Sequence, residues 1–418
     1  MIRQKRTSNI NFIMYLMGRM ISDTGTSIQM MVMPLYIIDV GGSATSIGLF
    51  TFVSLVPALM MYPFAGVLGD RINRKTIMVV TDFISAGVVL GVACISYFDR
   101  MSITLLLLAQ VIISLLNGIF DPATRGMLPK LVPENELTQA NSKLASLRSV
   151  SVFLGPVIGA VLYAKLGITV LFLINGISFL LSGTSEMLIK YEHVKRESKL
   201  RLAGIITDLS KGIRFIQNNK MIRQLCYFFL MMYMLIQPIF AVALPLFFKT
   251  RLAYSDIQYG YLQSISILGM LLGSLLTGLL FGEESNILKS LKVGCSLLVV
   301  SILVFSVLMF PDILAIFGNA SSIYFILLSI DFCLFSAAHM FINVPVQSFI
   351  QAETPEEYIS RVFSIVGMIT RGGIPFGALV YGVVLERVEI HLTVLMGALL
   401  MMIISVVFLT SPIKFHHD

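Results

Sequence analysis

The chain has 418 residues, of which 56% are hydrophobic and 13% are charged. Soluble domains carry about 25% charged residues, so this composition excludes an ordinary soluble protein and points to a lipid bilayer as its surroundings. The net charge of +7 does not indicate nucleic-acid binding, because membrane topology explains the basic residues better.

Long apolar runs follow one another along the whole chain. A bilayer core of about 30 Å needs about 20 helical residues, and the runs lack the alternating polarity of β-barrel strands. We therefore predict an all-α membrane protein with twelve transmembrane helices in two pseudo-symmetric six-helix bundles. The predicted spans are 11–38, 45–68, 76–97, 103–122, 139–163, 167–188, 222–247, 257–281, 290–310, 321–345, 361–385 and 391–410.

The basic residues predict the orientation of these spans. An even number of spans puts both termini on one side, and 21 of the 30 Lys and Arg residues lie on that side, with four more inside spans. The positive-inside rule then places both termini in the cytoplasm and the chain in the inner, or plasma, membrane of the cell. Five basic residues lie in the opposite loops: Arg100, Lys165, Lys249, Arg251 and Arg387.

One long basic connection divides the chain near its middle. We predict an N-terminal half at 1–188, a cytoplasmic linker at 189–221 and a C-terminal half at 222–418. Within the linker, Ile205–Ile216 is expected to form an amphipathic helix on the inner leaflet. The alternative is a solvated linker whose charges only set topology.

The two halves also share a pattern. Asp121-Pro122 ends the fourth span as Val344-Pro345 ends the tenth, and Gly155–Gly159 in the fifth span has a counterpart in Ile374–Gly377 of the eleventh. The same order with a nearly constant offset indicates a duplicated unit. Duplication is common in transporters, whose substrate site lies near the midplane between the repeats.

The loop after the second span reads GVLGDRINRK from Gly66. It resembles the signature G-x-x-x-D-R-x-G-R-K of the major facilitator superfamily, and it departs from that signature at Asn73, where glycine is usual. Asn tolerates a left-handed backbone, so we expect the turn to survive. The residues of this predicted cytoplasmic gate motif are Gly66, Gly69, Asp70, Arg71, Arg74 and Lys75.

The resemblance implies that this loop acts as a latch between the halves. Small residues at Gly66 and Gly69 permit close helix contact. Asp70 suits an arginine partner or a helix N-terminus, and Arg125 and Arg361 are the expected partners. A loop that only sets topology would explain the basic residues but not the spacing of Gly and Asp.

The fifth span reads SVFLGPVIGA from Ser151. It resembles the antiporter signature G-x-x-x-G-P-x-x-G-G, with Ser151 and Ala160 in place of the outer glycines, and this resemblance implies export against protons. Physically, Pro156 bends the helix, while Gly155 and Gly159 let it pack tightly. A bent packing helix is compatible with either transport direction.

The segment Asp121–Asn141, with the linker pattern at Asp208–Arg223, resembles bacterial macrolide-efflux-type and siderophore-exporter-type facilitators. The fourth span reads SLLNG at Ser114–Gly118 and lacks the arginine usual in antiporters of this family. This departure leaves the proton-coupling scheme open.

Ionisable residues inside spans are costly and are functional candidates by default. Proton coupling needs a carboxylate that responds to the accessible side, for which Asp23 is the first candidate and Asp331 the second. We expect the fifth and eleventh spans to offer one buried arginine each, near their prolines. The candidate residues for proton coupling or substrate binding are Arg19, Asp23, Arg148, Asp331, His339 and Arg371.

Each candidate also has a structural interpretation. Arg19 and Asp23 are spaced as an ion pair within one helix, and His339 suits a hydrogen-bonded structural histidine. The two arginines suit an anionic headgroup. Glu186 ends the sixth span, while Asp82 and Lys143 are placed near the cytoplasmic edge and receive no role.

The predicted function is proton-driven export of lipophilic or amphiphilic drugs by alternating access, as a monomer without cofactor or metal. Methionines and phenylalanines suit a cavity that repacks around varied apolar molecules, although lipid-facing positions use the same residues. The alternative is transport of an endogenous amphiphile such as a lysophospholipid or siderophore, without proton coupling. From another class, a lipid scramblase or a transporter-like sensor is conceivable, but a sensor is expected to carry an added soluble domain, and the sequence shows no such segment. No nucleotide-binding loop or nucleophile–base arrangement indicates an enzyme.

Overall fold

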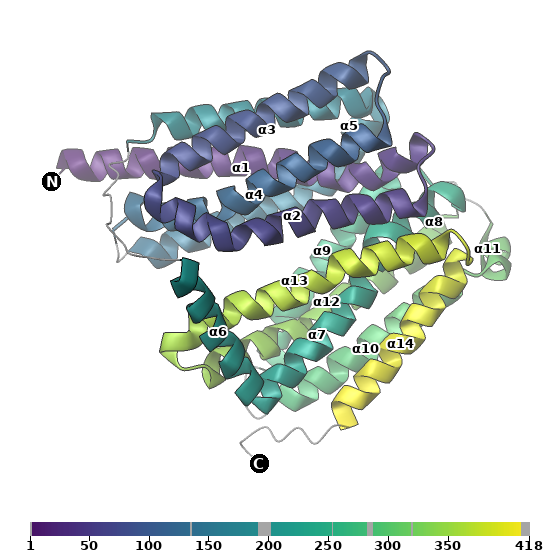
Figure 1. The fold of residues 1–418 in the computed structure, drawn as a ribbon. Coiled ribbons are helices and arrows are strands. Elements are labelled where there is room, and N and C mark those ends of the chain that lie inside the picture. The colour runs from purple at the N-terminus through teal and green to yellow at the C-terminus, as the bar shows by residue number, and fades with distance from the viewer. Residues whose placement is uncertain are drawn as a thin grey trace. The chain divides into compact units, whose positions relative to one another are not determined.

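The computed structural model describes residues 2–133, 136–190, 202–252, 254–281, 287–318 and 321–410, with side chains described throughout except at 2–9, 63, 65–71, 138, 202–209, 287, 356–361 and 364. All regular structure in these ranges is helical (Figure 1), which confirms the predicted all-α class. The elements are α1 (Ile2–Asp39), α2 (Ala44–Arg71), α3 (Arg74–Tyr97), α4 (Ile103–Leu131), α5 (Leu137–Leu188), α6 (Leu202–Asn218), α7 (Lys220–Pro238), η2 (Ile239–Ala243), α8 (Leu244–Thr250), α9 (Asp256–Phe281), α10 (Ile287–Leu308), α11 (Pro311–Phe317), α12 (Ser322–Glu353), α13 (Glu356–Leu385) and α14 (Ile390–Thr410).

Ten helical stretches of the described chain are long and apolar enough to cross a membrane. Each predicted span from 45–68 to 391–410 overlaps one of them. The first predicted span, 11–38, lies in α1, which carries polar and charged side chains along its length and is not among the ten. The count of twelve spans therefore stays a prediction.

One of the ten stretches, Gln139–Leu188, is 50 residues long and covers two predicted spans. At 1.5 Å per residue it would be about 75 Å long if straight, far more than a bilayer core. The chain instead turns at Gly167, whose φ is 74° and ψ is 178°. Glycine permits this backbone because it has no Cβ.

The predicted span 222–247 is not one regular helix. Proline lacks the N–H donor that continues an α-helix, and α7 ends at Pro238. The next five residues, Ile239–Ala243, form the π-helix η2 before α8 begins. Such wider turns often occur where a helix has a functional role.

The chain forms two compact units, one of Met1–Gly41 and Phe50–Ile205 and the other of Gly42–Leu49 and Ile206–Asp418. In the first unit α5 packs against α1 and α3, and α4 packs against α3. In the second, α12 packs against α9 and α10, and α13 against α7. Helix α6 contains the helix predicted at Ile205–Ile216.

The repeated glycine motifs pack in the same way in each unit. A Cβ added at Gly155 of α5 would lie 2.8 Å from the Ser27 Cβ of α1. A Cβ added at Gly377 of α13 would overlap the Met234 carbonyl oxygen of α7. Both helix pairs therefore approach so closely that only glycine fits, which agrees with the duplication predicted from the sequence.

Candidate functional site

Three charged side chains of the first unit meet beside an aromatic ring. Arg19 and Asp23 lie one turn apart on α1, with Arg19 Nη2 2.9 Å from Asp23 Oδ1. The same Nη2 lies 3.9 Å from Oδ1 of Asp121 on α4. The guanidinium carbon is 4.9 Å from the centroid of Phe120, within cation–π range. We call Arg19, Asp23, Asp121 and Phe120 the Arg19 cluster.

The Arg19 cluster is largely shielded. The side chain of Arg19 is 9% exposed, while those of Asp23 and Asp121 are 21% and 29% exposed. A buried guanidinium needs such partners, because an unpaired charge in apolar surroundings is costly. When both acids are ionised, the cluster carries one negative charge more than positive. Arg148 of α5 supplies a further positive charge that acts on Asp23.

The helix with the predicted antiporter motif supports the helix that carries the Arg19 cluster. Ser151 Oγ of α5 lies 2.8 Å from Oγ1 of Thr24, the residue that follows Asp23. Further along the two helices, a Cβ added at Gly159 of α5 would lie 3.0 Å from the carbonyl oxygen of Ile28, which is one turn after Thr24 on α1. The small residues of the motif thus fix α1 next to α5 at the level of the candidate acid.

Two of the predicted site residues are not buried. Arg148 is exposed, because the side chains from Asn141 to Val150 of α5 are all exposed or half-buried. Arg371 of α13 is exposed as well, and its charge acts on Tyr233. The prediction of one buried arginine near each proline was wrong, because a place inside an apolar run does not reveal whether another helix covers it.

Asp121 and Phe120 belong to the site but are absent from the residues predicted for it. From the sequence, Asp121-Pro122 serves only as a marker of the repeat. The available signal was that an acid lies inside the fourth predicted span, where a charge is a functional candidate. The contact of Asp121 with Arg19 depends on how α4 and α1 pack, and this packing has no local sequence pattern.

The second unit contains a cluster of aromatic and amide side chains. Asn343 Nδ2 of α12 donates to the Tyr233 hydroxyl of α7 at 2.9 Å, and Gln347 Nε2 donates to Asn343 Oδ1 at 2.8 Å. His339 Nε2 lies 3.3 Å from Asn343 Nδ2. The His339 ring meets the Tyr233 ring edge-on, with 5.6 Å between centroids. We call Tyr233, His339, Asn343 and Gln347 the Tyr233 cluster.

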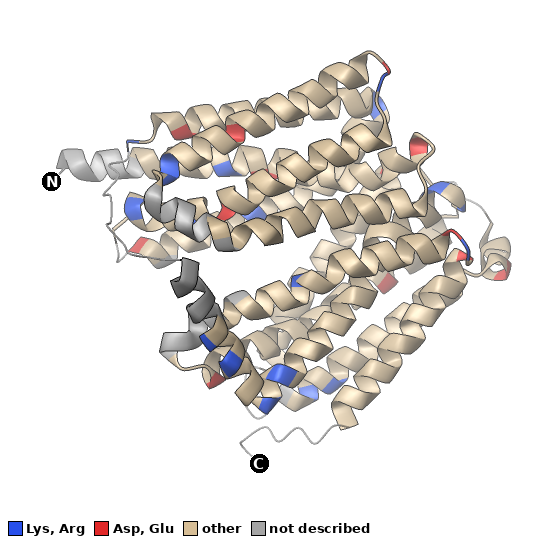
Figure 2. Ribbon diagram, in the orientation of Figure 1, with Lys and Arg blue, Asp and Glu red and all other residues tan. Residues whose placement is uncertain are grey.

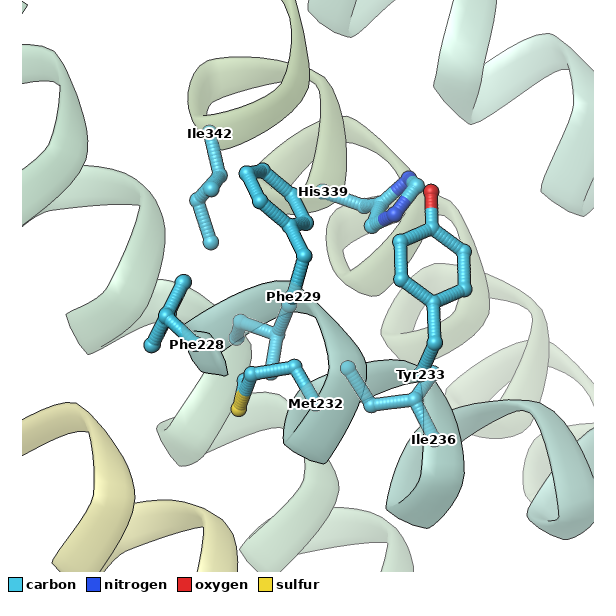
Figure 3. Close-up of a pocket in the computed structure, with 8 residues that line it drawn as sticks. Phe228, Phe229, Met232, Tyr233, Ile236, His339 and Ile342 are labelled. Carbon is cyan, nitrogen blue, oxygen red and sulfur yellow. The ribbon is translucent and has the colours of Figure 1, made fainter. Parts of the chain in front are cut away.

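Apolar side chains enclose a small cavity beside this cluster, and Figure 3 shows the His339 and Tyr233 rings side by side at its edge. The free space is about 10 Å³, roughly what one water needs, whereas drug-sized ligands occupy about 300–1,000 Å³. Side chains must therefore move before an organic molecule enters. The other lining residues are Phe228, Phe229, Met232, Ile236, Leu298 and Ile342.

Asp331, the second predicted proton carrier, is buried on α12. Its Oδ1 accepts a hydrogen bond of 2.8 Å from Ser301 Oγ of α10, and no ion pair joins it among the described residues. His339 follows two turns later on the same helix and bonds to Asn343 instead. The structure therefore does not bring the two candidates of the tenth predicted span to a common partner.

Asp82 and Glu186 are the most buried acids among the described residues, at 2% and 1% exposure. Most charged positions lie near helix ends, and a few lie within helices (Figure 2). Helix α5 covers Asp82: a Cβ at Gly183 would lie 3.4 Å from the Asp82 Cβ. The predicted position of Asp82 near the cytoplasmic edge of the membrane stays a prediction.

The basic end of the predicted gate motif connects α3 to its neighbours. Asn73 caps α3 by accepting from the Lys75 backbone N–H at 2.9 Å, and with φ −56° it does not use the expected left-handed backbone. Lys75 Nζ donates to the Met187 carbonyl oxygen at 2.7 Å, and the Arg74 guanidinium lies against Gly126 of α4. Other side chains of the expected latch lie outside the described ones, namely Gly66, Gly69, Asp70, Arg71 and Arg361.

Known proteins resemble this chain over almost its full length. The family model of the Major Facilitator Superfamily matches residues 15–378. Macrolide efflux protein A of Streptococcus pyogenes is 22% identical over 394 residues, 93% of each chain. Multidrug efflux pump Tap of Mycolicibacterium fortuitum is 22% identical over 415 residues, 96% of this chain and 95% of Tap. A mutant of the nucleoside transporter NupG has a TM-score of 0.76 at 14% identity and covers 96% of this chain and 98% of its own.

These matches confirm the resemblance that rests on the loop at Gly66–Lys75, and they confirm the similarity to macrolide-efflux proteins. The fold agrees with that of a solved transporter. The chain is therefore a multi-pass membrane transporter of a small molecule, and not an enzyme. The chain belongs to the Major Facilitator Superfamily.

Proposed function

We propose that this transporter exports lipophilic or amphiphilic compounds by proton antiport with alternating access, and that Asp23 carries the proton. The efflux-pump relatives support export. The observation that carries the proposal is the position of Arg19 between two carboxylates, 2.9 Å from Asp23 and 3.9 Å from Asp121.

A proton on Asp23 removes the charge that attracts Arg19. Arg19 then turns to Asp121. The exchange replaces a contact within α1 by a contact between α1 and α4. A change of helix partner of this kind biases one conformation over another.

The substrate and the proton compete for the same acid. A cationic or hydrogen-bonding substrate that binds at Asp23 favours the ionised carboxylate, and a proton on Asp23 disfavours that substrate. By linkage, each changes the affinity of the other by the same factor. Proton entry from one side of the membrane thereby releases substrate on that side.

The topology of the proposal follows the charge asymmetry of the sequence. We place both termini in the cytoplasm and the protein, as a monomer, in the inner membrane of the cell. The halves 1–188 and 222–418 move about the linker 189–221.

Transport in proteoliposomes under an imposed pH gradient tests the proposal. A cationic drug, a neutral macrolide and a lysolipid are compared as substrates. We expect the pH gradient to drive uptake of the drugs into the proteoliposomes. Asp23→Asn should abolish this gradient-driven uptake, while exchange of drug down its own concentration gradient persists. Asp312→Asn, an exposed acid of α11, is the matched control. Unchanged gradient-driven flux in Asp23→Asn would contradict the assignment.

One observation favours a second candidate function, transport of an endogenous anionic amphiphile. Arg148 and Arg371 are exposed and join no ion pair among the described residues, so both are free to bind an anionic headgroup. Saturable lysolipid flux that ignores the pH gradient and falls in Arg148→Gln would support this alternative. Arg100→Gln, in a loop, should leave that flux unchanged.

A further inference from the structure

A second pair of acids lies inside the first unit. Asp82 of α3 packs against α5 at Gly183, three residues before Glu186, so both carboxyls belong to the same stretch of the α3–α5 contact. The charge of Asp82 acts on the Glu186 carboxyl. With exposures of 2% and 1%, neither carboxyl reaches solvent or lipid.

Four oxygen atoms at this place lack a hydrogen bond of ordinary geometry among the described residues. They are Asp82 Oδ2, Ser182 Oγ and both carboxyl oxygens of Glu186, although the Ser182 hydroxyl lies close enough to Asp82 to act on its charge. Buried polar oxygens are almost always hydrogen-bonded, so four such atoms together need a physical cause. A proton on one carboxyl supplies it, because the proton turns an acceptor into a donor for the neighbouring oxygen.

The cations around the pair are engaged elsewhere. Arg19 of α1 acts on both carboxyls, but its guanidinium is paired within the Arg19 cluster. Lys75 of α3 donates to the carbonyl oxygen of Met187, the residue after Glu186. Neither cation forms an ion pair with Asp82 or Glu186 in the described part of the chain.

The remaining titratable groups that face the pair are acids or a phenol. Asp23 of α1 acts on Asp82 and adds negative charge. Asp121 of α4 is bound to the same arginine as Asp23. Tyr15 of α1 donates its hydroxyl to the Thr124 carbonyl oxygen at 3.2 Å, so it remains a neutral neighbour that is already bonded.

We propose that Asp82 and Glu186 share one proton and form a second proton-binding site of this transporter. Two neighbouring carboxylates without a cation of their own do not both stay ionised in apolar surroundings. One proton leaves the pair with a single negative charge and a hydrogen bond between the acids or to Ser182. The site binds this proton whether or not transport is proton-driven. Only its use in antiport rests on the proposed function.

The proton of this pair controls the Arg19 cluster through Arg19. Loss of the proton adds a negative charge within reach of the guanidinium and draws Arg19 from Asp23. Asp23 then binds its own proton more readily. The two proton sites are therefore coupled, and the coupling is reciprocal.

Infrared difference spectroscopy of the purified full-length protein in lipid vesicles tests the proposal. A protonated carboxyl gives a carbonyl stretch at higher frequency than a carboxylate, and the band shifts in D₂O. We expect wild type to show such a band at neutral pH, Glu186→Gln to lose it, and Asp82→Asn to shift it. Asp312→Asn should leave the band unchanged.

Three results would overturn the proposal that Asp82 and Glu186 share a proton. Absence of the band in wild type does so without any variant, so misfolding of a variant does not obscure the result. A band that both variants retain unchanged also overturns it. A band that vanishes when Na⁺ replaces K⁺ overturns it in favour of a metal-ion site. The measurement needs no substrate, so failure of gradient-driven export leaves it interpretable.

Discussion

In the first unit a cluster of charged side chains lies between the helices, where Arg19 contacts two acids on α1 and α4. In the second unit the cluster of α7 and α12 consists of a phenol, an imidazole and two amides, joined by hydrogen bonds. Asp331 in the second unit bonds to a hydroxyl, and none of the described cations pairs with it. The same helix-packing motif, Gly155 in one unit and Gly377 in the other, thus supports two different kinds of polar site.

This difference suggests a division of labour between the units. A proton changes the charge of an acid–arginine cluster outright and so rearranges its ion pairs. The amides of the Tyr233 cluster do not titrate, and the cluster adapts to a ligand by moving rings and apolar side chains. We expect proton sensitivity to map to the first unit and substrate shape sensitivity to the second.

The largest effect should come from removing the only cation of the Arg19 cluster. Arg19→Gln leaves the partly buried Asp23 and Asp121 without compensation, and loss of one partner of a buried ion pair costs about 3–5 kcal/mol. Denaturant titration in detergent micelles measures this loss of unfolding free energy. The matched change Arg251→Gln breaks an exposed pair with Glu389, whose side chains are 51% and 56% exposed, and should cost about 0–1 kcal/mol. Equal losses of unfolding free energy in Arg19→Gln and Arg251→Gln would show that the buried and the exposed ion pairs contribute alike to stability.

The next effect concerns the packing that both units share. Gly155→Ala and Gly377→Ala each place a Cβ where another helix already lies, and overpacking costs about 1–3 kcal/mol. Gly87→Ala meets nothing within 4 Å and should stabilise α3 by up to about 1 kcal/mol through helix propensity. Thermal unfolding of the three variants measures both the expected destabilisation by Gly155→Ala and Gly377→Ala and the expected stabilisation by Gly87→Ala. A stabilised Gly155→Ala would show that α1 and α5 pack more loosely than the Gly155–Ser27 approach implies.

A smaller effect is expected in the Tyr233 cluster. Tyr233→Phe removes the acceptor for Asn343, and a hydrogen bond contributes about 0.5–1.5 kcal/mol. Tyr227→Phe on the same helix, with an exposed side chain, should leave the unfolding free energy unchanged. The comparison becomes sharper if Tyr233→Phe also alters drug selectivity and leaves the pH dependence of transport as in wild type.

The smallest effect is a pH dependence outside the membrane spans. The hydroxyls of Thr45 and Ser43, which belong to the second unit, lie beside the Glu386 carboxylate and lower its pKa from the ordinary 4.5. A lowered pKa stabilises the fold above the ordinary value, and the stabilisation is lost as the pH falls through the lowered pKa. Wild type should therefore melt slightly higher than Glu386→Gln at neutral pH, and the difference should shrink in acid. A constant difference would argue against this contact.

The sequence predicts which residues lie in helices better than it predicts which of their faces are covered. Apolar runs locate the helices because any buried or lipid-facing helix needs them. The irregular elements are harder, since the π-helix at Ile239–Ala243 depends on how the chain accommodates Pro238. Helix α11 (Pro311–Phe317) lies between two predicted spans and was not predicted, although Pro311 at its start, Asp312 in its first turn and Gly318 after its end are local helix signals.

The candidate site shows the same limit more clearly. Arg19 and Asp23 are found from their spacing on one helix. Arg148 and Asp82 both lie within predicted spans, yet Arg148 is exposed and Asp82 is buried by α5. Their surroundings are set by neighbouring helices from distant parts of the chain, so composition and periodicity do not distinguish them.

The turn of α5 at Gly167 is a suitable place for testing the membrane topology. A Cβ at this glycine meets nothing within 4 Å, so its backbone conformation and not its surroundings excludes other residues. Open turns of this kind tolerate inserted residues well. A short epitope spliced in after Gly167 would therefore leave both arms of α5 in place, and antibody access in intact cells would report on which side of the membrane this turn lies.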